Sequence, residues 1–98
     1  MCLDVCVNMK LTTKIYGHEN SWEFGPCSSS QVYANNQEYS ERCCLTPGEY
    51  TLRCIDTYGD GWHQGSIEIN GNDYCGDFER GHEATRQITI EGKYTFDF

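Results

Sequence analysis

The chain has 98 residues, which is enough for one small domain and too few for two independent hydrophobic cores. Only 38% of the residues are hydrophobic, and this fraction includes seven cysteines, so the core must be small. The formal net charge of −8 argues against nucleic acid as a partner and favours cations or basic surfaces. No run of about 18 apolar residues occurs, so the sequence predicts no membrane-spanning helix and no membrane insertion.

Apolar and polar residues alternate with a period of two along much of the chain, which predicts strands, and helical periodicity is almost absent. In the first strand, Val5, Val7, Met9, Leu11 and Ile15 are expected to share one face. Strands of this kind are predicted, in chain order, at residues 5–15, 50–55, 66–70, 87–91 and 94–98. Because one face of each is polar, we expect an all-β fold, an antiparallel β-sandwich or jelly roll.

The two halves of the chain share a weak sequence echo. Strand 8–15 is followed by a Tyr-Gly pair, an acidic stretch and Trp22. Strand 50–55 is followed by another Tyr-Gly pair, an acidic stretch and Trp62. If the echo reflects two related halves, both loops lie at the same end of the sandwich. Coincidence in a sequence rich in Tyr and Gly is the alternative.

Residues 56–62, DTYGDGW, are the most informative stretch for chemistry. Their spacing resembles the first half of an EF-hand loop, with Asp56 as first ligand, Asp60 as third and the Trp62 carbonyl next. Tyr58 occupies the position of the second ligand, and no helix pattern flanks the loop. An EF-hand is therefore excluded, whereas a calcium loop between two strands stays open.

Calcium takes about six to eight oxygen ligands, so two aspartates are not enough. We expect Glu19, in the sister loop, to be the third carboxylate, and Asp77 is the next candidate. The alternative is a tight turn in which the Asp side chains accept backbone N–H groups and no ion is bound.

The aromatic residues and histidines of these loops allow two interpretations each. Trp22 and Trp62 are predicted to be core residues, because the chain is poor in aliphatic side chains. A glycan-binding site formed by Trp62, Tyr58 and Asp60, with His63 beside them, is the alternative. His18 and His63 match no zinc spacing and are expected to be solvated loop residues, with a transition-metal site as the alternative. No nucleophile elbow, HExxH or Walker motif occurs, so no enzymatic activity is predicted.

The seven cysteines are typical of a secreted, disulfide-bonded domain. Their odd number leaves at least one without a partner inside the chain, and Cys2 is the candidate for a free thiol or an intermolecular disulfide. The other six are predicted to form disulfides: Cys6, Cys27, Cys43, Cys44, Cys54 and Cys75. Cys54 and Cys75 bracket the acidic loop and are expected to pair. Adjacent Cys43 and Cys44 point to opposite faces of a strand, so Cys27 takes one of them and Cys6 the other. A thiol-rich metal site is the alternative, but zinc-ribbon spacing is absent.

The first residues lack the basic segment and long apolar stretch of a signal peptide. Because a secreted protein is expected to carry one, we expect residues 1–98 to form a single module excised from a longer protein.

Two motifs resemble a family of extracellular β-sandwich accessory modules, CUB-like in general character, that are attached to proteases, adhesins and matrix proteins. Residues 44–52, CLTPGEYTL, and 56–62, DTYGDGW, resemble its pattern C-L-x-x-G-x-Y-T followed by D-S-Y-G-D-G. Residues 11–22, LTTKIYGHENSW, resemble its partner motif T-D-x-Y-x-x-E-T-x-W. The resemblance implies a non-catalytic module with Glu19, Asp56 and Asp60 at the acidic positions. Lys14 departs from the pattern, because the family often has Asp there.

These observations lead to two functional hypotheses. The first is a non-catalytic, extracellular, calcium-binding structural or adhesion module whose partners are other extracellular proteins or glycans. The second is a lectin-like module that binds glycans through the loop 56–62. A small secreted ligand is a third interpretation, which the precursor sequence would decide.

Overall fold

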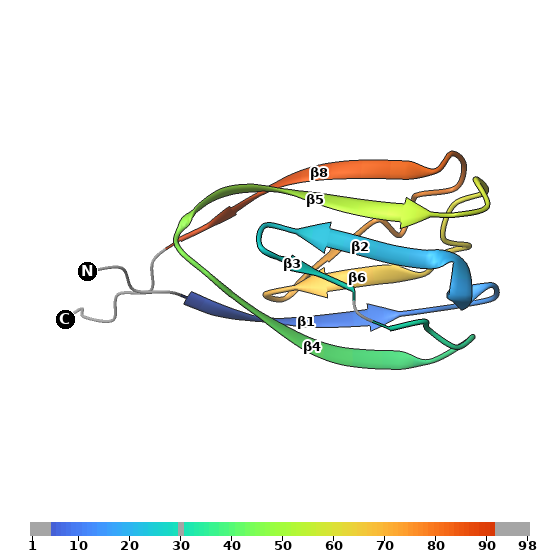
Figure 1. The fold of residues 1–98 in the computed structure, drawn as a ribbon, viewed down its shortest axis with the longest axis horizontal. Helices are drawn as coiled ribbons and strands as arrows, with labels where there is room; N and C mark the ends of the chain where they lie inside the picture. The colour runs from blue at the N-terminus through green and yellow to red at the C-terminus, as the bar shows by residue number, and fades with distance from the viewer. Residues whose placement is uncertain (1–4, 30, 92–98) are drawn as a thin grey trace.

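In the computed structural model, which describes residues 5–29 and 31–91, the chain forms two antiparallel four-stranded sheets packed as a sandwich (Figure 1). The predicted all-β sandwich is confirmed. One single-turn 3₁₀ helix, η1 (Gly17–Glu19), interrupts the strands. Within the described ranges, no helix has the length and hydropathy needed to cross a membrane. The strand predicted at 94–98 and the thiol of Cys2 lie outside the described residues.

The two sheets use strands from both halves of the chain. In chain order the strands are β1 (Val5–Thr12), β2 (Asn20–Phe24), β3 (Cys27–Ser28), β4 (Glu38–Leu45), β5 (Gly48–Asp56), β6 (Ser66–Ile69), β7 (Asn72–Tyr74) and β8 (Glu83–Ile90). The first sheet has the order β4-β1-β6-β7 and the second β3-β2-β5-β8. The chain therefore crosses between sheets after β1, β3, β4, β5 and β7.

The core fills the space between the sheets with the residues that the alternation assigned to the inner face. Val7, Met9 and Leu11 of β1 are each at most 3% exposed, as predicted. The expectation that Ile15 shares this face is wrong, because Ile15 is 50% exposed. Strand β1 ends at Thr12, and the Thr13 hydroxyl donates to the carbonyl of Ala34 at 2.6 Å, which takes the chain out of the sheet.

Three disulfides link the described residues; the predicted Cys54–Cys75 pair is confirmed, and the structure settles which of Cys43 and Cys44 each of the other two takes. Cys54 pairs with Cys75, Cys27 with Cys43, and Cys6 with Cys44. The first two connect one sheet to the other, whereas Cys6 and Cys44 are register partners within the first sheet. Cys43 is buried and Cys44 exposed, so adjacent cysteines on one strand reach different partners. These links supplement a core that is small for the chain length.

One end of the sandwich gathers most of the irregular chain. Residues 13–19, 31–37, 57–65 and 75–82 connect strands at the right-hand end in Figure 1, and we call these four segments the loop end. At the opposite end of β6, Asn70 and Gly71 form a two-residue hairpin turn to β7, with φ of 53° and 91°. Both φ values are positive, as a tight two-residue Asn-Gly turn requires.

Candidate metal centre

The loop after β1 and the loop after β5 meet at the loop end, as the sequence echo predicts. The Thr57 N–H donates to the Glu19 carbonyl at 3.1 Å, and the rings of Tyr16 and His63 lie 5.0 Å apart. Strands β2 and β5 pair antiparallel, with Asn20 opposite Asp56. The start of β2 and the end of β5 therefore deliver their polar residues to one place.

Asp56 is fully buried, and its carboxylate organises the backbone of its own loop. Its Oδ2 accepts the N–H groups of Gly59 at 2.8 Å, Asp60 at 2.5 Å and Gly61 at 2.8 Å, and its Oδ1 accepts that of Tyr58 at 3.3 Å. This is the hydrogen-bonded turn that the sequence offered as the alternative to an ion site.

Burial raises the pKa of Asp56, but interactions with its loop outweigh burial and hold the pKa below the ordinary value of 3.8. These interactions are a side-chain contact with Asp60 and the N–H groups that bond to the charged carboxylate. Gly61 permits the turn, because its φ is 83° and a β-carbon there would collide with the backbone of Phe78 and Glu79.

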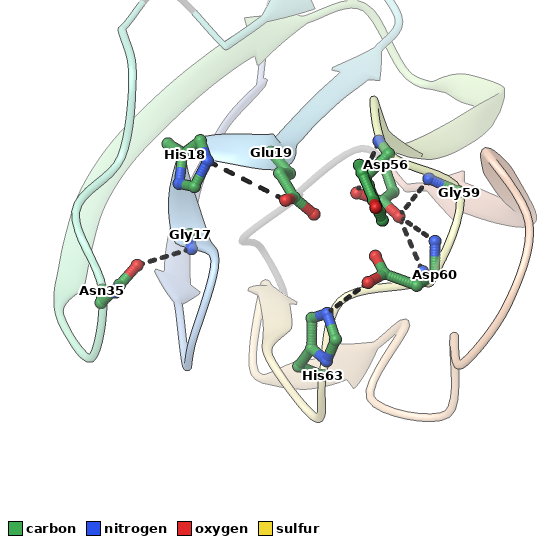
Figure 2. Close-up of polar contacts among 10 residues, drawn as sticks. Gly17, His18, Glu19, Asn35, Asp56, Gly59, Asp60 and His63 are labelled. Atoms are coloured by element: carbon green, nitrogen blue, oxygen red, sulfur yellow. Dashed lines mark hydrogen bonds and ion pairs between the residues drawn. The ribbon is translucent and has the colours of Figure 1, made fainter.

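Glu19, Asp60 and His63 form a second cluster beside this turn. Each offers a ligand atom, and the three atoms lie within 4.8 Å of one another (Figure 2). The Glu19 Oε1, Asp60 Oδ1 and His63 Nε2 atoms are buried and have no hydrogen-bond partner. His63 Nε2 lies 3.2 Å from Asp60 Oδ2, within ion-pair distance. Unpartnered buried acceptors are costly, so the cluster has capacity for a ligand.

Burial and like charge both act on the cluster. Burial, then the nearby carboxylates of Asp60 and Asp56, raise the pKa of Glu19 above its ordinary 4.5. His18 acts in the opposite direction, with its Nε2 3.9 Å from Glu19 Oε2, but its side chain is 61% exposed. Three carboxylates from two loops therefore crowd one site.

Asn20 is a further buried polar residue, opposite Asp56 at the start of β2. It is 3% exposed, and neither its Oδ1 nor its Nδ2 has a hydrogen-bond partner. Because Asn20 and Asp56 are register partners, both side chains lie on the inner face of the sheet. The sequence analysis missed Asn20. Asn20 could have been recognised because it lies two residues before Trp22 and four before Phe24, so it faces the core on the same side of β2.

Besides Asp56, which bonds to its own loop, two predicted ligands lie outside the cluster. Asp77 has an 80% exposed side chain that accepts a hydrogen bond from Arg86 at 2.8 Å, so its assignment as a ligand is corrected. Its loop also passes the end of β5, but the carboxylate turns outward. The Trp62 carbonyl accepts the Gly65 N–H at 2.8 Å, a bond that closes the turn rather than joining the cluster.

The predicted aromatic glycan platform also requires correction. Trp62 is fully buried, and its indole N–H donates to the Ile55 carbonyl at 2.9 Å. Neither face of the ring is open to a sugar, so Trp62 is a core residue, as is Trp22, which is 2% exposed. Tyr58 remains 73% exposed at the tip of the loop.

Comparisons with protein-family models, curated proteins and solved structures find no match to this chain. The geometry and donor atoms of the cluster therefore indicate what the site can bind. Glu19 and Asp60 supply carboxylate oxygens, the ligands that hard cations such as Ca²⁺ prefer. His63 supplies a nitrogen that calcium does not favour and that zinc accepts.

Proposed function

We propose that this chain is a non-catalytic extracellular structural or adhesion module whose loop end binds a calcium ion between Glu19 and Asp60. One observation carries the proposal. Buried acceptors without hydrogen-bond partners converge from two loops, in a cluster whose carboxylates crowd one another. A divalent cation would satisfy these oxygens and neutralise the like charge that burial strengthens.

The position of the ion gives it a structural role. The loop after β1 leads from the first sheet to the second, and the loop after β5 leads back. An ion held by Glu19 from one loop and Asp60 from the other ties the two crossings together. The oxygens of Glu19 and Asp60 leave several positions of the calcium shell for water or a ligand.

The extracellular assignment rests on the disulfides and on the ligand count. Three disulfides within the described residues fit an oxidising compartment. A site with few protein ligands binds calcium weakly, and extracellular modules typically bind with dissociation constants of about 0.1–1 mM. Such a site fills where calcium is abundant, outside the cell.

Thermal unfolding tests this proposal directly. The protein is unfolded in EGTA and in about 5 mM calcium, with magnesium and zinc as further arms. A site of the affinity given above stabilises the native state by about 1–2 kcal/mol under these conditions, which raises Tm by at least about 4 °C. Equal Tm values in EGTA and calcium would exclude the site.

Three variants locate the ion. Glu19→Gln and Asp60→Asn each remove one carboxylate and are expected to abolish the calcium shift. Asp77→Asn is the matched control, because Asp77 lies in a neighbouring loop but outside the cluster. A calcium shift that survives both Glu19→Gln and Asp60→Asn would place the ion elsewhere.

A further inference from the structure

A cavity of about 640 Å³ opens at the loop end beside the Glu19–Asp60–His63 cluster. Asp60 and His63 belong to both the cluster and the cavity wall, and the rest of the wall includes Lys14, Asn36, Gln64 and Glu79. The wall is thus built by all four segments of the loop end. Its volume falls in the range of sites for small molecules, which is about 300–1,000 Å³.

The backbone around this cavity is strained. Of the six non-glycine residues with positive φ in ranges 5–29 and 31–91, three line the cavity: Asn36 at 55°, His63 at 52° and Gln64 at 73°. A fourth, Tyr16 at 60°, packs its ring against His63. Asn and His occur in this conformation more often than most residues, but for Gln and Tyr it is unfavourable. Such strain concentrates at binding sites, where it orients side chains toward a ligand.

The chemistry of the wall indicates what the cavity takes. Asn36 and Gln64 each carry an amide that donates and accepts, Glu79 accepts and Lys14 donates. An anionic ligand would meet the carboxylates of Glu79 and Asp60, and a cationic one would meet Lys14. A neutral ligand rich in hydroxyl groups, each both donor and acceptor, matches this mixture.

Apolar contact is available at the same rim. Ile15, which lines the cavity, is 50% exposed, and the neighbouring Tyr16 is 46% exposed. The C–H face of a sugar ring could pack against these two side chains while its hydroxyls face the polar wall.

We propose that this cavity binds a glycan, and that vicinal hydroxyls of one sugar ring coordinate the calcium ion held by Glu19 and Asp60. This inference rests on the proposed calcium site. An ion at the cluster borders the cavity because Asp60 and His63 line both, and its shell has positions that the protein does not fill. Sugar recognition thus uses the ion and the amides of Asn36 and Gln64 rather than the buried ring of Trp62.

A printed glycan array, incubated with the protein in about 5 mM calcium and in EGTA, tests the inference together with the thermal shift. We expect calcium to raise Tm and a subset of glycans to be bound in calcium alone. A calcium shift without any bound glycan overturns the cavity inference and leaves the proposed function intact. Absence of the calcium shift overturns both. Glycan binding that is equal in EGTA overturns coordination through the ion.

Variants then place the glycan in the cavity. Glu79→Gln and Asn36→Gly remove wall hydrogen bonds, and glycine tolerates the positive φ of Asn36. Each is expected to weaken binding of the strongest array glycan about tenfold in titration calorimetry, with the calcium shift unchanged. The control is Glu49→Gln, an exposed glutamate on β5 near the opposite end. Wild-type affinity in both cavity variants would overturn the location.

Discussion

Asp56 and Asp60 lie four residues apart in the same loop, and their carboxylates have opposite surroundings. Asp56 is fully buried and accepts four backbone N–H groups. Asp60 has a 38% exposed side chain, yet its Oδ1 is buried without a partner beside Glu19 and His63. The Asp56 carboxylate stabilises the loop backbone, and the loop in turn holds the Asp60 carboxylate beside Glu19 and His63.

Burial and charge alone therefore do not identify a carboxylate that binds an ion. The backbone of the loop already neutralises Asp56 through its N–H dipoles, so an ion there would have to displace hydrogen bonds. No such compensation reaches the Asp60 Oδ1 or the Glu19 Oε1. We therefore expect loss of Asp56 to destabilise the fold and loss of Asp60 or Glu19 to remove ion binding.

The largest effect is expected from Asp56→Asn. This change places amide hydrogens against N–H donors and removes the charge that strengthens the four bonds. The free energy of unfolding should fall by about 3 kcal/mol or more, in calcium and in EGTA alike. Urea denaturation measures it. Asp60→Asn, the matched change, should cost less than about 1 kcal/mol in EGTA. Equal losses would remove the distinction between the two aspartates.

The disulfide beneath the loop is expected to have the next largest effect. Cys54 and Cys75 are 21 residues apart in sequence and connect the two sheets beside the acidic turn. Replacing both with Ala should reduce stability by about 3 kcal/mol through the larger entropy of the unfolded chain. Because both cluster loops keep their contacts, the calcium shift in Tm should persist. Its loss would show that the disulfide positions the ion ligands.

Glu19→Gln is expected to be more stable than the wild type in EGTA but less stable than it in calcium. In EGTA the charged Glu19 is opposed by burial and by two neighbouring carboxylates, so the neutral variant should be slightly more stable at pH 7. In calcium the wild type should become the more stable of the two. Calorimetric Tm values in both buffers test this reversal. A wild type that is more stable in both conditions would contradict it.

The pH dependence in EGTA distinguishes the carboxylates again. Because folding raises the pKa of Glu19, its favourable contribution to the free energy of unfolding is complete below pH 4.5. This contribution is lost as the pH rises through the folded-state pKa. Because folding lowers the pKa of Asp56, its favourable contribution to the free energy of unfolding is present above pH 3.8. It is lost as the pH falls through the folded-state pKa. Wild-type stability minus that of Glu19→Gln should therefore decrease with rising pH. A flat difference curve would contradict the crowding of charge.

The smallest change in the calcium-induced rise in Tm is expected from His63→Gln. Calcium prefers oxygen ligands, so the calcium shift in Tm should change by less than about 1 °C. If zinc also stabilises the wild type, that shift should disappear, because zinc would use the imidazole nitrogen. Loss of the calcium shift together with that of zinc would show that His63 positions Asp60, which it contacts at 3.2 Å.

Much of the fold could be predicted from local patterns. Alternation placed Val7, Met9 and Leu11 in the core, because side chains of a strand point to opposite faces in turn. The opposite facing of Cys43 and Cys44 predicted, for the same reason, that they bond different partners, but not which of them pairs with Cys27 and which with Cys6. Ile15 continued the pattern but not the strand, since the hydroxyl of Thr13 bonds to the backbone of another loop.

The sequence by itself determined a small, acidic, disulfide-bonded β-sandwich with carboxylates concentrated in two loops, because composition, spacing and alternation are local properties. Only the tertiary structure decided which carboxylates lack partners. It brought Glu19 and His63 to Asp60, turned Asp77 outward and buried Trp62. The physical reason is that the hydrogen-bonding capacity of a side chain is used or left open by neighbours far away in sequence, and alternation along one strand carries no information about them.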